Sequence, residues 1–212
     1  MPISDKHRLL FVHIPKNAGT SLEKCLNTRE TGHRRWEQYR DDYPLEWNTY
    51  TSFAVLRDPV ERFISSYNYA RMEKSLYHSS IPGDKAKYGM HPDYELCKSK
   101  SIDEVAEILV NNKNSLRHPG WWPQHHFVTS DGRIAVDCLI NLTKLDAAIA
   151  ELAPNALIEH FNRSSSSQKT DLDEKSISML SSFYSYDTDL YNISEKHNIN
   201  ILWTQASKSK NH

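Results

Sequence analysis

A short run of small and hydroxyl-bearing residues near the start of the chain has the composition of an anion-binding loop. Its members are Lys16, Asn17, Ala18, Gly19, Thr20 and Ser21. Residues 21–26 then take up helical spacing, so several backbone N–H groups and the start of a helix point into one small space. Because such a space suits a phosphate, we expect this loop to bind a phosphate-containing group. An ordinary strand-to-helix turn closed by a Thr or Ser cap is the alternative.

The order of residues separates this loop from the nucleotide-binding loop GxxxxGK[ST]. In that motif the lysine follows the last glycine, and the Ser or Thr hydroxyl contacts a metal ion. Here Lys16 precedes Gly19, which sets the ammonium on the strand side of a bound group. The sequence therefore favours a phosphate-containing donor other than ATP.

A second pair of residues has the donors for another anion. Arg57 follows a buried apolar run, and Ser65 lies about two turns along the next predicted helix. A guanidinium and a hydroxyl both donate hydrogen bonds to anions, so we expect Arg57 and Ser65 to close on one phosphate. A surface arginine beside an amphipathic helix would give the same pattern, and the presence of the first loop favours the anion site.

Two apolar runs would position these residues. Residues 9–14 and 51–56 are predicted to be buried strands, and each is followed by one of the two anion-binding segments. Pro59 favours the start of a helix after the second strand. Strands that alternate with helices predict an α/β domain with a mostly parallel sheet, in which loops at the carboxyl ends of the strands form the binding crevice.

The rest of the chain supplies further elements. We predict a strand over residues 134–140, an extended piece over 157–161, and helices over 102–109, 142–152, 177–184 and 187–197. Ser101 and Glu104 predict a capping box for the first of these helices. Residues 73–101 have weak periodicity and are predicted to form an irregular insertion, suited to a lid on the acceptor side. Residues 1–205 are predicted to form a single domain, and residues 206–212 a flexible tail.

The composition excludes several protein classes. The net charge is -1 and hydrophobic residues make up 38%, so the chain is neither disordered nor a uniformly basic nucleic-acid-binding protein. Three separated cysteines without CxxC spacing indicate neither a disulfide scaffold nor a zinc site. The N-terminus lacks a signal-peptide pattern, and no run is long enough to cross a bilayer. We expect a cytoplasmic protein without membrane insertion, although a trimmed lumenal domain would have the same features. The sequence does not predict an oligomeric state.

The two motifs together resemble those of sulfotransferases that use 3'-phosphoadenosine 5'-phosphosulfate (PAPS). Residues 16–21 look like the 5'-phosphosulfate loop of these enzymes, and residues 57–67 look like their 3'-phosphate motif. The chain is most similar to the carbohydrate (Golgi-type) sulfotransferase family 2, which includes the heparan sulfate 2-O-sulfotransferases. Weaker likeness extends to residues 123–127 and 160–164.

This resemblance implies a P-loop-like three-layer sandwich, with a central mostly parallel sheet flanked by helices. It implies in-line transfer of a sulfuryl group from PAPS to a carbohydrate hydroxyl, with adenosine 3',5'-bisphosphate as the product and no metal. The donor-binding residues that it implies are Pro15, Lys16, Asn17, Ala18, Gly19, Thr20, Ser21, Arg57, Ser65, Arg163, Ser164 and Ser165. The last three belong to a Ser-rich segment that closes over the 3'-phosphate in the family, and a flexible linker is the alternative.

The implied reaction needs a fixed positive charge and a base. Lys16 can stabilise the charge that grows on the leaving oxygen, and a base must take the proton of the acceptor hydroxyl. His33 is the candidate base, because it lies between the two donor motifs and resembles the second histidine of the 2-O-sulfotransferase pattern HGH. The first histidine of that pattern is replaced here by Thr31, and Glu37 and His126 are alternative bases.

A Pro- and Gly-rich loop over residues 118–127 contains the candidate acceptor-binding residues. Trp121 and Trp122 could stack on a sugar face, with core anchoring as the alternative, and Gln124 and His126 lie close to them. Two other functions stay open. The missing GK[ST] order argues against an ATP-dependent P-loop kinase, and Lys16 with a candidate base argues against a non-catalytic nucleotide- or glycan-binding module.

Overall fold

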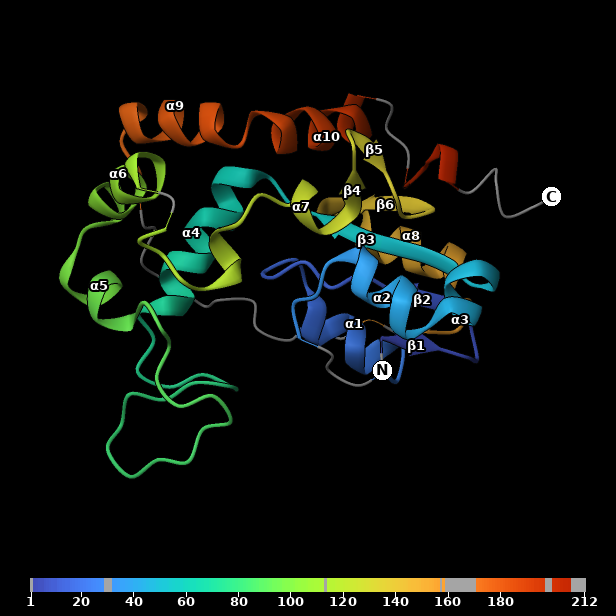
Figure 1. Cartoon of the computed structure of the whole chain (residues 1–212), viewed down its shortest axis with the longest axis horizontal. Coiled ribbons are helices and arrows are strands. Elements are labelled where there is room, and N and C mark those ends of the chain that lie inside the picture. The colour runs from blue at the N-terminus through green and yellow to red at the C-terminus, as the bar shows by residue number, and fades with distance from the viewer. Residues whose placement is uncertain are drawn as a thin grey trace. The chain divides into compact units, whose positions relative to one another are not determined.

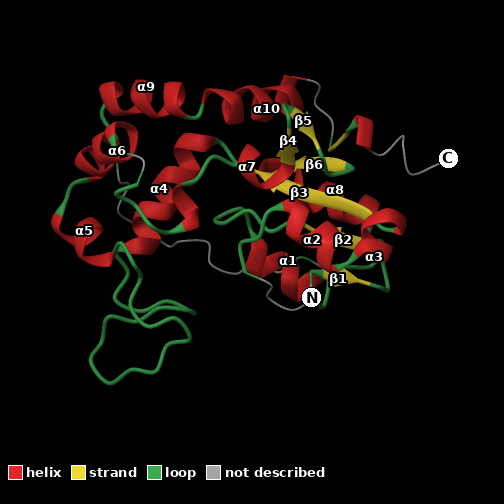
Figure 2. Ribbon diagram, in the orientation of Figure 1, coloured by secondary structure: helices red, strands yellow, loops and turns green. Residues whose placement is uncertain are grey.

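The computed structural model describes residues 2–28, 32–112, 114–156, 158, 171–196 and 200–206 (Figure 1, Figure 2). The contacts among them divide the chain into two compact units, each built from separate segments. The first unit comprises the described residues of Met1–Asp58, Pro123–Ser165 and Tyr186–His212, and the second those of Pro59–Trp122 and Ser166–Ser185. The first unit contains a sheet with helices, whereas helices and loops make up the second.

A five-stranded mixed sheet lies at the centre of the first unit. Its strand order is β1 (Ile3–Ser4), β2 (Leu9–Phe11), β3 (Thr51–Leu56), β6 (Cys138–Asn141) and β7 (Ile201–Trp203). The central strands β2, β3 and β6 are parallel, whereas β1 and β7 run antiparallel to their neighbours. The predicted α/β class is confirmed, and the parallel arrangement is limited to the three central strands.

Helices cover both faces of this sheet, because residues along each strand alternate between two apolar clusters. Leu10 and Ala54 belong to one cluster, and Phe11 and Val55 belong to the other. The helices of the first cluster are α2 (Trp36–Asp42), α3 (Pro44–Thr49), α7 (His125–Val128) and α10 (Ser185–Lys196). Those of the second are α1 (Gly19–Cys25) and α8 (Leu145–Leu152). Burial on both faces explains why the central strands are continuous apolar runs in the sequence.

The second unit packs its helices around an apolar cluster of its own, to which Phe63 and Trp121 belong. These helices are α4 (Pro59–Ala70), α5 (Tyr94–Ser99), α6 (Ile102–Asn111), the 3-10 helix η1 (Pro119–Trp121) and α9 (Glu174–Phe183). The predicted capping box of α6 is confirmed. The Glu104 N–H donates to Ser101 Oγ (3.2 Å), and the Ser101 N–H donates to Glu104 Oε2 (2.8 Å).

Some predicted elements differ from the structure. The strand predicted over residues 134–140 is interrupted, because its first part pairs in a separate hairpin of β4 (Thr129–Ser130) and β5 (Arg133–Ile134). Between that hairpin and β6, Asp137 Oδ2 accepts hydrogen bonds from the N–H (2.8 Å) and the Oγ (2.7 Å) of Ser52. The insertion at 73–101 is not wholly irregular, because it contains α5.

Some elements of the structure were not predicted, and some predictions fall on residues that the structure does not describe. Helices α2 and α3 were not predicted, because their few apolar residues are separated by polar ones. Strand β7 was not predicted, because its three residues are too few to show a periodicity. The extended piece at 157–161 and the Ser-rich loop at 162–170 lie outside the described residues, with the exception of Ile158. The single-domain prediction stays a prediction.

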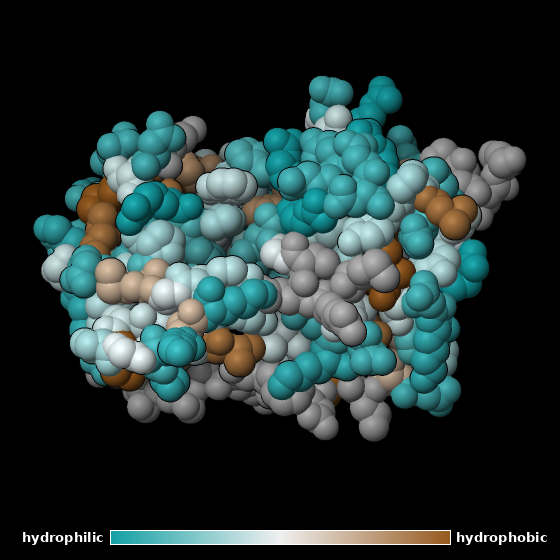
Figure 3. Space-filling view, turned by 60° about the horizontal axis from the view of Figure 1, so that its bottom comes forward, coloured by the Kyte–Doolittle hydropathy of each residue, from teal (hydrophilic) through white to brown (hydrophobic). Residues whose placement is uncertain are grey.

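The surface of the molecule is largely polar where Figure 3 displays it. On that face, hydrophobic side chains occur in small separate groups. In the parts of the chain that the structure describes, no helix has both the length and the apolar character that spanning a bilayer requires.

Candidate active site

The turn after β2 has the backbone shape of an anion-binding loop. Lys16 (φ 71°) and Ala18 (φ 61°) both have positive φ, which is uncommon for residues that carry a Cβ. Helix α1 begins directly afterwards at Gly19, and it has no acidic residue in its first turn and no capping side chain at Ala18. A turn of this kind before a helix start favours a negatively charged ligand.

Gly19 is required by the close approach of a histidine that the sequence analysis did not select. A Cβ on Gly19 would lie only 1.8 Å from His13 Nε2. His13 is 9% exposed and stacks on Phe11, with ring centroids 5.4 Å apart. Its imidazole therefore lies directly against the predicted phosphate loop. The available indication in the sequence was a single histidine inside an apolar run.

Asn17 holds the loop in place with its side chain. It is fully buried, and its Nδ2 donates to the Val55 carbonyl (2.6 Å) and to Gln124 Oε1 (2.6 Å). The loop after β2 is thus fixed to the end of β3. Asn17 was predicted to bind the donor, and its side chain instead supports the shape of the loop that would do so.

Arg57 joins the second predicted donor segment to the first. Its N–H donates to Gln124 Oε1 (3.0 Å), and Gln124 Nε2 donates to its carbonyl (2.8 Å). The guanidinium Nη1 donates to the Lys16 carbonyl (3.4 Å). The segments that follow β2 and β3 therefore meet, and Lys16 and Arg57 are neighbours.

Gln124 is an internal connector, which corrects its predicted role in acceptor binding. The side chain is fully buried, and Asn17 and Arg57 engage both ends of its amide. Its own N–H donates to Oδ2 of the fully buried Asp187 (2.5 Å). Asp187 was predicted only as part of a helix, and its role depends on packing against a distant loop.

His33, the candidate base, contacts the same region. It is half-buried, and its ring meets the His13 ring edge-on, with centroids 4.7 Å apart and an interplanar angle of 76°. Because His13 lies against Gly19, this contact brings His33 to the predicted donor loop. Of the alternative bases, Glu37 is ion-paired with Arg35 (2.8 Å).

The adjacent histidines on α7 have different surroundings. His125 Nδ1 lies 2.7 Å from Asp187 Oδ1, whereas His126, the other alternative base, is exposed and packs its ring on His125 at 4.5 Å. Among the residues that the structure describes, no group of three His, Cys, Asp or Glu side chains has an arrangement that could hold a metal ion.

The two tryptophans of the acceptor prediction have opposite exposure. Trp121 is 1% exposed in the core of the second unit, so the prediction that it stacks on a sugar is wrong and its alternative, core anchoring, applies. Trp122 is 41% exposed and is accessible to a ligand. Trp121 is the last residue of η1, and Trp122 follows the end of that helix.

The remaining predicted donor-binding residues are only partly described. Thr20 and Ser21 lie in the first turn of α1, where Thr20 is half-buried and Ser21 is buried. Ser65 is half-buried on α4, within the second unit. Arg163, Ser164 and Ser165 lie outside the described residues. The part of the site that the structure brings together therefore consists of the Lys16 loop, Arg57 and His33.

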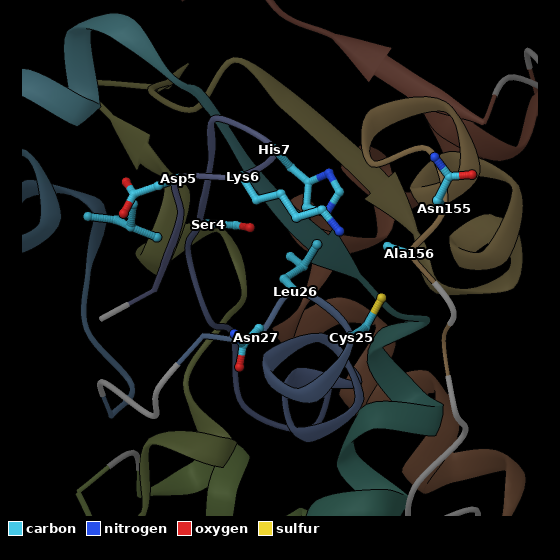
Figure 4. Close-up of a pocket in the computed structure, with 10 residues that line it drawn as sticks. Ser4, Asp5, Lys6, His7, Cys25, Leu26, Asn27, Asn155 and Ala156 are labelled. Carbon is cyan, nitrogen blue, oxygen red and sulfur yellow. The ribbon is translucent and has the colours of Figure 1, made fainter.

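A pocket of about 440 Å³ lies elsewhere in the first unit (Figure 4). Residues around β1 line it together with the C-terminal end of α1, the opposite end of that helix from Lys16. Cys25 is one of these residues, and burial raises the pKa of its thiol. None of the predicted site residues that the structure describes lines this pocket, and the Lys16 loop, Arg57 and His33 are not part of it.

The comparisons with known proteins bear on the family. No curated protein and no solved structure matches the chain. A family model described as "Sulfotransferase family" matches residues 1–194. This region includes the Lys16 loop, Arg57 and His33, and the match supports a sulfotransfer activity. Because the match extends over most of the sequence, the chain belongs to the sulfotransferase family.

Proposed function

We propose that the protein transfers the sulfuryl group of PAPS to a hydroxyl group of a carbohydrate, leaving adenosine 3',5'-bisphosphate. The observation that carries this proposal is the contact between the Lys16 carbonyl and the Arg57 guanidinium (3.4 Å). A donor with an anionic group at each end needs two cationic segments within the reach of one small molecule. Membership of the sulfotransferase family supports the same chemistry.

The residues of the two segments suit an anionic nucleotide donor. Residues 15–21 would hold its 5' end in a P-loop-like turn, and Arg57 would hold its 3'-phosphate. The positive φ values at Lys16 and Ala18 and the absence of acid in the first turn of α1 favour this use. The donor supplies an activated sulfuryl group, and the chain supplies orientation and charge.

Lys16 is the residue that we expect to stabilise the leaving group. Negative charge grows on the bridging oxygen as the S–O bond lengthens, and a nearby ammonium with oriented N–H groups stabilises that charge. Lys16 is half-buried, so water screens its charge less than it would on an open surface. A preorganised donor of this kind contributes roughly 10²–10³ in kcat.

His33 is the proposed base that takes the proton of the acceptor hydroxyl. Its ring contact with His13, which in turn lies against Gly19, supports this role. Glu37 is less suited because it is already paired with Arg35. A positioned base typically contributes roughly 10²–10⁴ in rate.

A carbohydrate is the proposed acceptor class. Trp122 is 41% exposed, and an exposed indole can pack on the apolar face of a sugar. The family resemblance to carbohydrate sulfotransferases supports the same class. His126, which is exposed on α7, is a further candidate for an acceptor contact.

The test measures nucleotide binding and turnover in three variants. Lys16→Ala should lower kcat roughly 10²–10³-fold while adenosine 3',5'-bisphosphate still binds. Arg57→Ala should weaken the binding of that nucleotide about tenfold or more, because a charge-assisted hydrogen bond is lost. Lys24→Ala removes an exposed lysine from the last turn of the same helix α1 and serves as the matched control.

Thermal shift separates the competing functions. Adenosine 3',5'-bisphosphate should raise the melting temperature of the wild type, and Mg-ATP should not. Stabilisation by Mg-ATP alone would instead favour a kinase. Nucleotide binding without transfer of label from PAPS to any of a mixed set of glycans would favour a binding module. Wild-type affinity and turnover in both Lys16→Ala and Arg57→Ala would overturn the assignment.

A further inference from the structure

His13 is a buried histidine that the proposed reaction does not yet use. It lies two residues beyond the end of β2 and stacks on Phe11 at an interplanar angle of 24°. On its other side the ring leaves no room for a Cβ at Gly19. A ring enclosed on two sides is held in one orientation, so the surroundings of its nitrogens are fixed.

A carboxylate lies beside one of these nitrogens. His13 Nδ1 is 3.4 Å from Glu23 Oε1, and both side chains are 11% exposed. The contact is not an aligned hydrogen bond, because His13 Nδ1 has no hydrogen-bond partner of suitable geometry. A carboxylate at this distance favours the tautomer with a proton on Nδ1. It also stabilises positive charge that develops on a neighbouring ring.

His33 is that neighbouring ring. Its T-shaped contact with His13 (4.7 Å) restrains its orientation. His13 therefore contacts both Glu23 and His33 within the first unit. The cations that flank His33 in the sequence have partners of their own, because Arg34 pairs with Asp42 and Arg35 pairs with Glu37. Glu23 is thus a carboxylate in contact with the His13 ring, which in turn contacts the His33 ring.

We propose that His13, backed by Glu23, is a positioning residue that orients His33 to receive the proton of the acceptor hydroxyl. This inference rests on the proposed function and deepens it. In the reaction, the acceptor oxygen bonds to sulfur, the S–O bond to the phosphate of the donor breaks, and the hydroxyl proton moves to His33. The resulting imidazolium is stabilised by the Glu23 charge behind His13, and it later releases its proton to water.

The first experiment follows the ring resonances of His33 by NMR while the pH is varied. Glu23→Gln keeps the shape of the side chain and removes its charge, and His33→Gln assigns the resonances. We expect the His33 titration midpoint to fall by roughly 0.5–1 pH unit in Glu23→Gln, because the imidazolium loses a stabilising negative charge. Glu46→Gln, which removes a carboxylate from α3, should leave the midpoint unchanged.

The second readout is turnover. Glu23→Gln and His13→Phe should each lower kcat roughly ten- to hundredfold, the effect typical of losing an outer partner of a functional histidine, while KM for PAPS stays near the wild-type value. The acid limb of the kcat–pH profile should move to lower pH in Glu23→Gln. His13→Phe keeps a ring against Phe11 and loses the polar contact with Glu23.

Two results would overturn the proposal. One is an unchanged His33 titration in Glu23→Gln, and the other is wild-type kcat in both Glu23→Gln and His13→Phe. If the wild type fails to turn over PAPS while the midpoint still shifts in Glu23→Gln, the proposed function fails and the coupling between Glu23, His13 and His33 stands. Should His13→Phe not fold, Glu23→Gln alone decides the outcome.

Discussion

Among the described residues, histidine rings lie close together in both units of the molecule. Besides the pair His125 and His126 on α7, the first unit contains one such group and the second unit another. In the first unit, His13 and His33 lie 4.7 Å apart between ring centroids. In the second unit, the corresponding distances are 4.6 Å for His91 and His118, 5.1 Å for His78 and His91, and 6.1 Å for His78 and His118. Ring distance alone therefore does not distinguish the two groups.

The surroundings of the rings do distinguish them. In the second unit, His91 Nδ1 accepts the Asp93 N–H (3.2 Å) and His118 Nδ1 accepts the Gly120 N–H (2.9 Å), so both rings support the local backbone. In the first unit a carboxylate lies beside His13, and the loop that we assign to the donor lies against it. A histidine becomes suited to proton transfer through its charged neighbours and its access to a substrate, and clustering by itself is a packing feature.

Replacement of the candidate base should give the largest difference between the two groups. His33→Ala should lower kcat roughly 10²–10⁴-fold, because no base then takes the acceptor proton, while the affinity for adenosine 3',5'-bisphosphate stays unchanged. His118→Asn keeps an acceptor at the start of η1 and should leave kcat within about twofold. Steady-state kinetics measure both. Equal losses in the two variants would erase the functional distinction.

Substitution of the glycine beside each group tests how tightly each ring is held. Gly19→Ala sets a Cβ 1.8 Å from His13 Nε2, and it should lower both kcat and stability, the latter by about 1–3 kcal/mol. Gly120→Ala sets a Cβ 2.9 Å from His118 Nδ1 and should cost less, because a smaller shift relieves the contact. Urea unfolding gives both free energies. A larger loss for Gly120→Ala would contradict the enclosure of His13.

The smallest expected effect is a pH dependence of stability from the second group. Burial lowers the pKa of His78 below its usual 6.5, and a hydrogen bond with the Gly89 backbone partly opposes this shift. The unfolded chain therefore binds more protons than the folded one as the pH falls below 6.5, so the free energy of unfolding decreases through that range. His78→Gln should flatten this decrease between pH 7 and pH 5, because the group whose pKa is lowered by burial is then absent.

Urea titrations at a series of pH values measure the slope for the wild type and for His78→Gln. A difference in stability that is the same at every pH would reflect lost packing only. It would remove the argument that His78 is kept neutral by its enclosure.

The central strands of the fold were predictable because burial on both faces leaves uninterrupted apolar runs, as in β3. The helices α2 and α3 were not predictable, because their buried residues Trp36 and Trp47 have charged neighbours in the sequence that mask the helical periodicity of apolar residues. The antiparallel edge strands also escaped prediction. β1 and β7 have two and three residues, too short for a periodicity, and they depend on pairing with distant segments.

For the site, the cationic residues could be predicted from the sequence, whereas the hydrogen bonds that connect their segments could not. Lys16 and Arg57 follow apolar strands, so their meeting could be expected from a parallel sheet. The bond from Asn17 to Gln124 joins residues 107 positions apart, and nothing local in a Pro- and Gly-rich loop indicates it. Trp121 and Trp122 are adjacent residues of the same type, so the sequence alone does not indicate that Trp121 is buried and Trp122 exposed.

The side-chain amide of Gln124 couples the loop that contains Asn17 to the segment that contains Arg57. The Gln124 side chain forms hydrogen bonds with the side chain of Asn17, in the loop after β2, and with the N–H and carbonyl of Arg57, after β3. A substitution in one segment should therefore affect the other, and the free-energy costs of changes in both segments should not be additive. If the two segments bind the donor as we propose, donor selectivity depends on both of them, and a redesign for a different nucleotide has to change both.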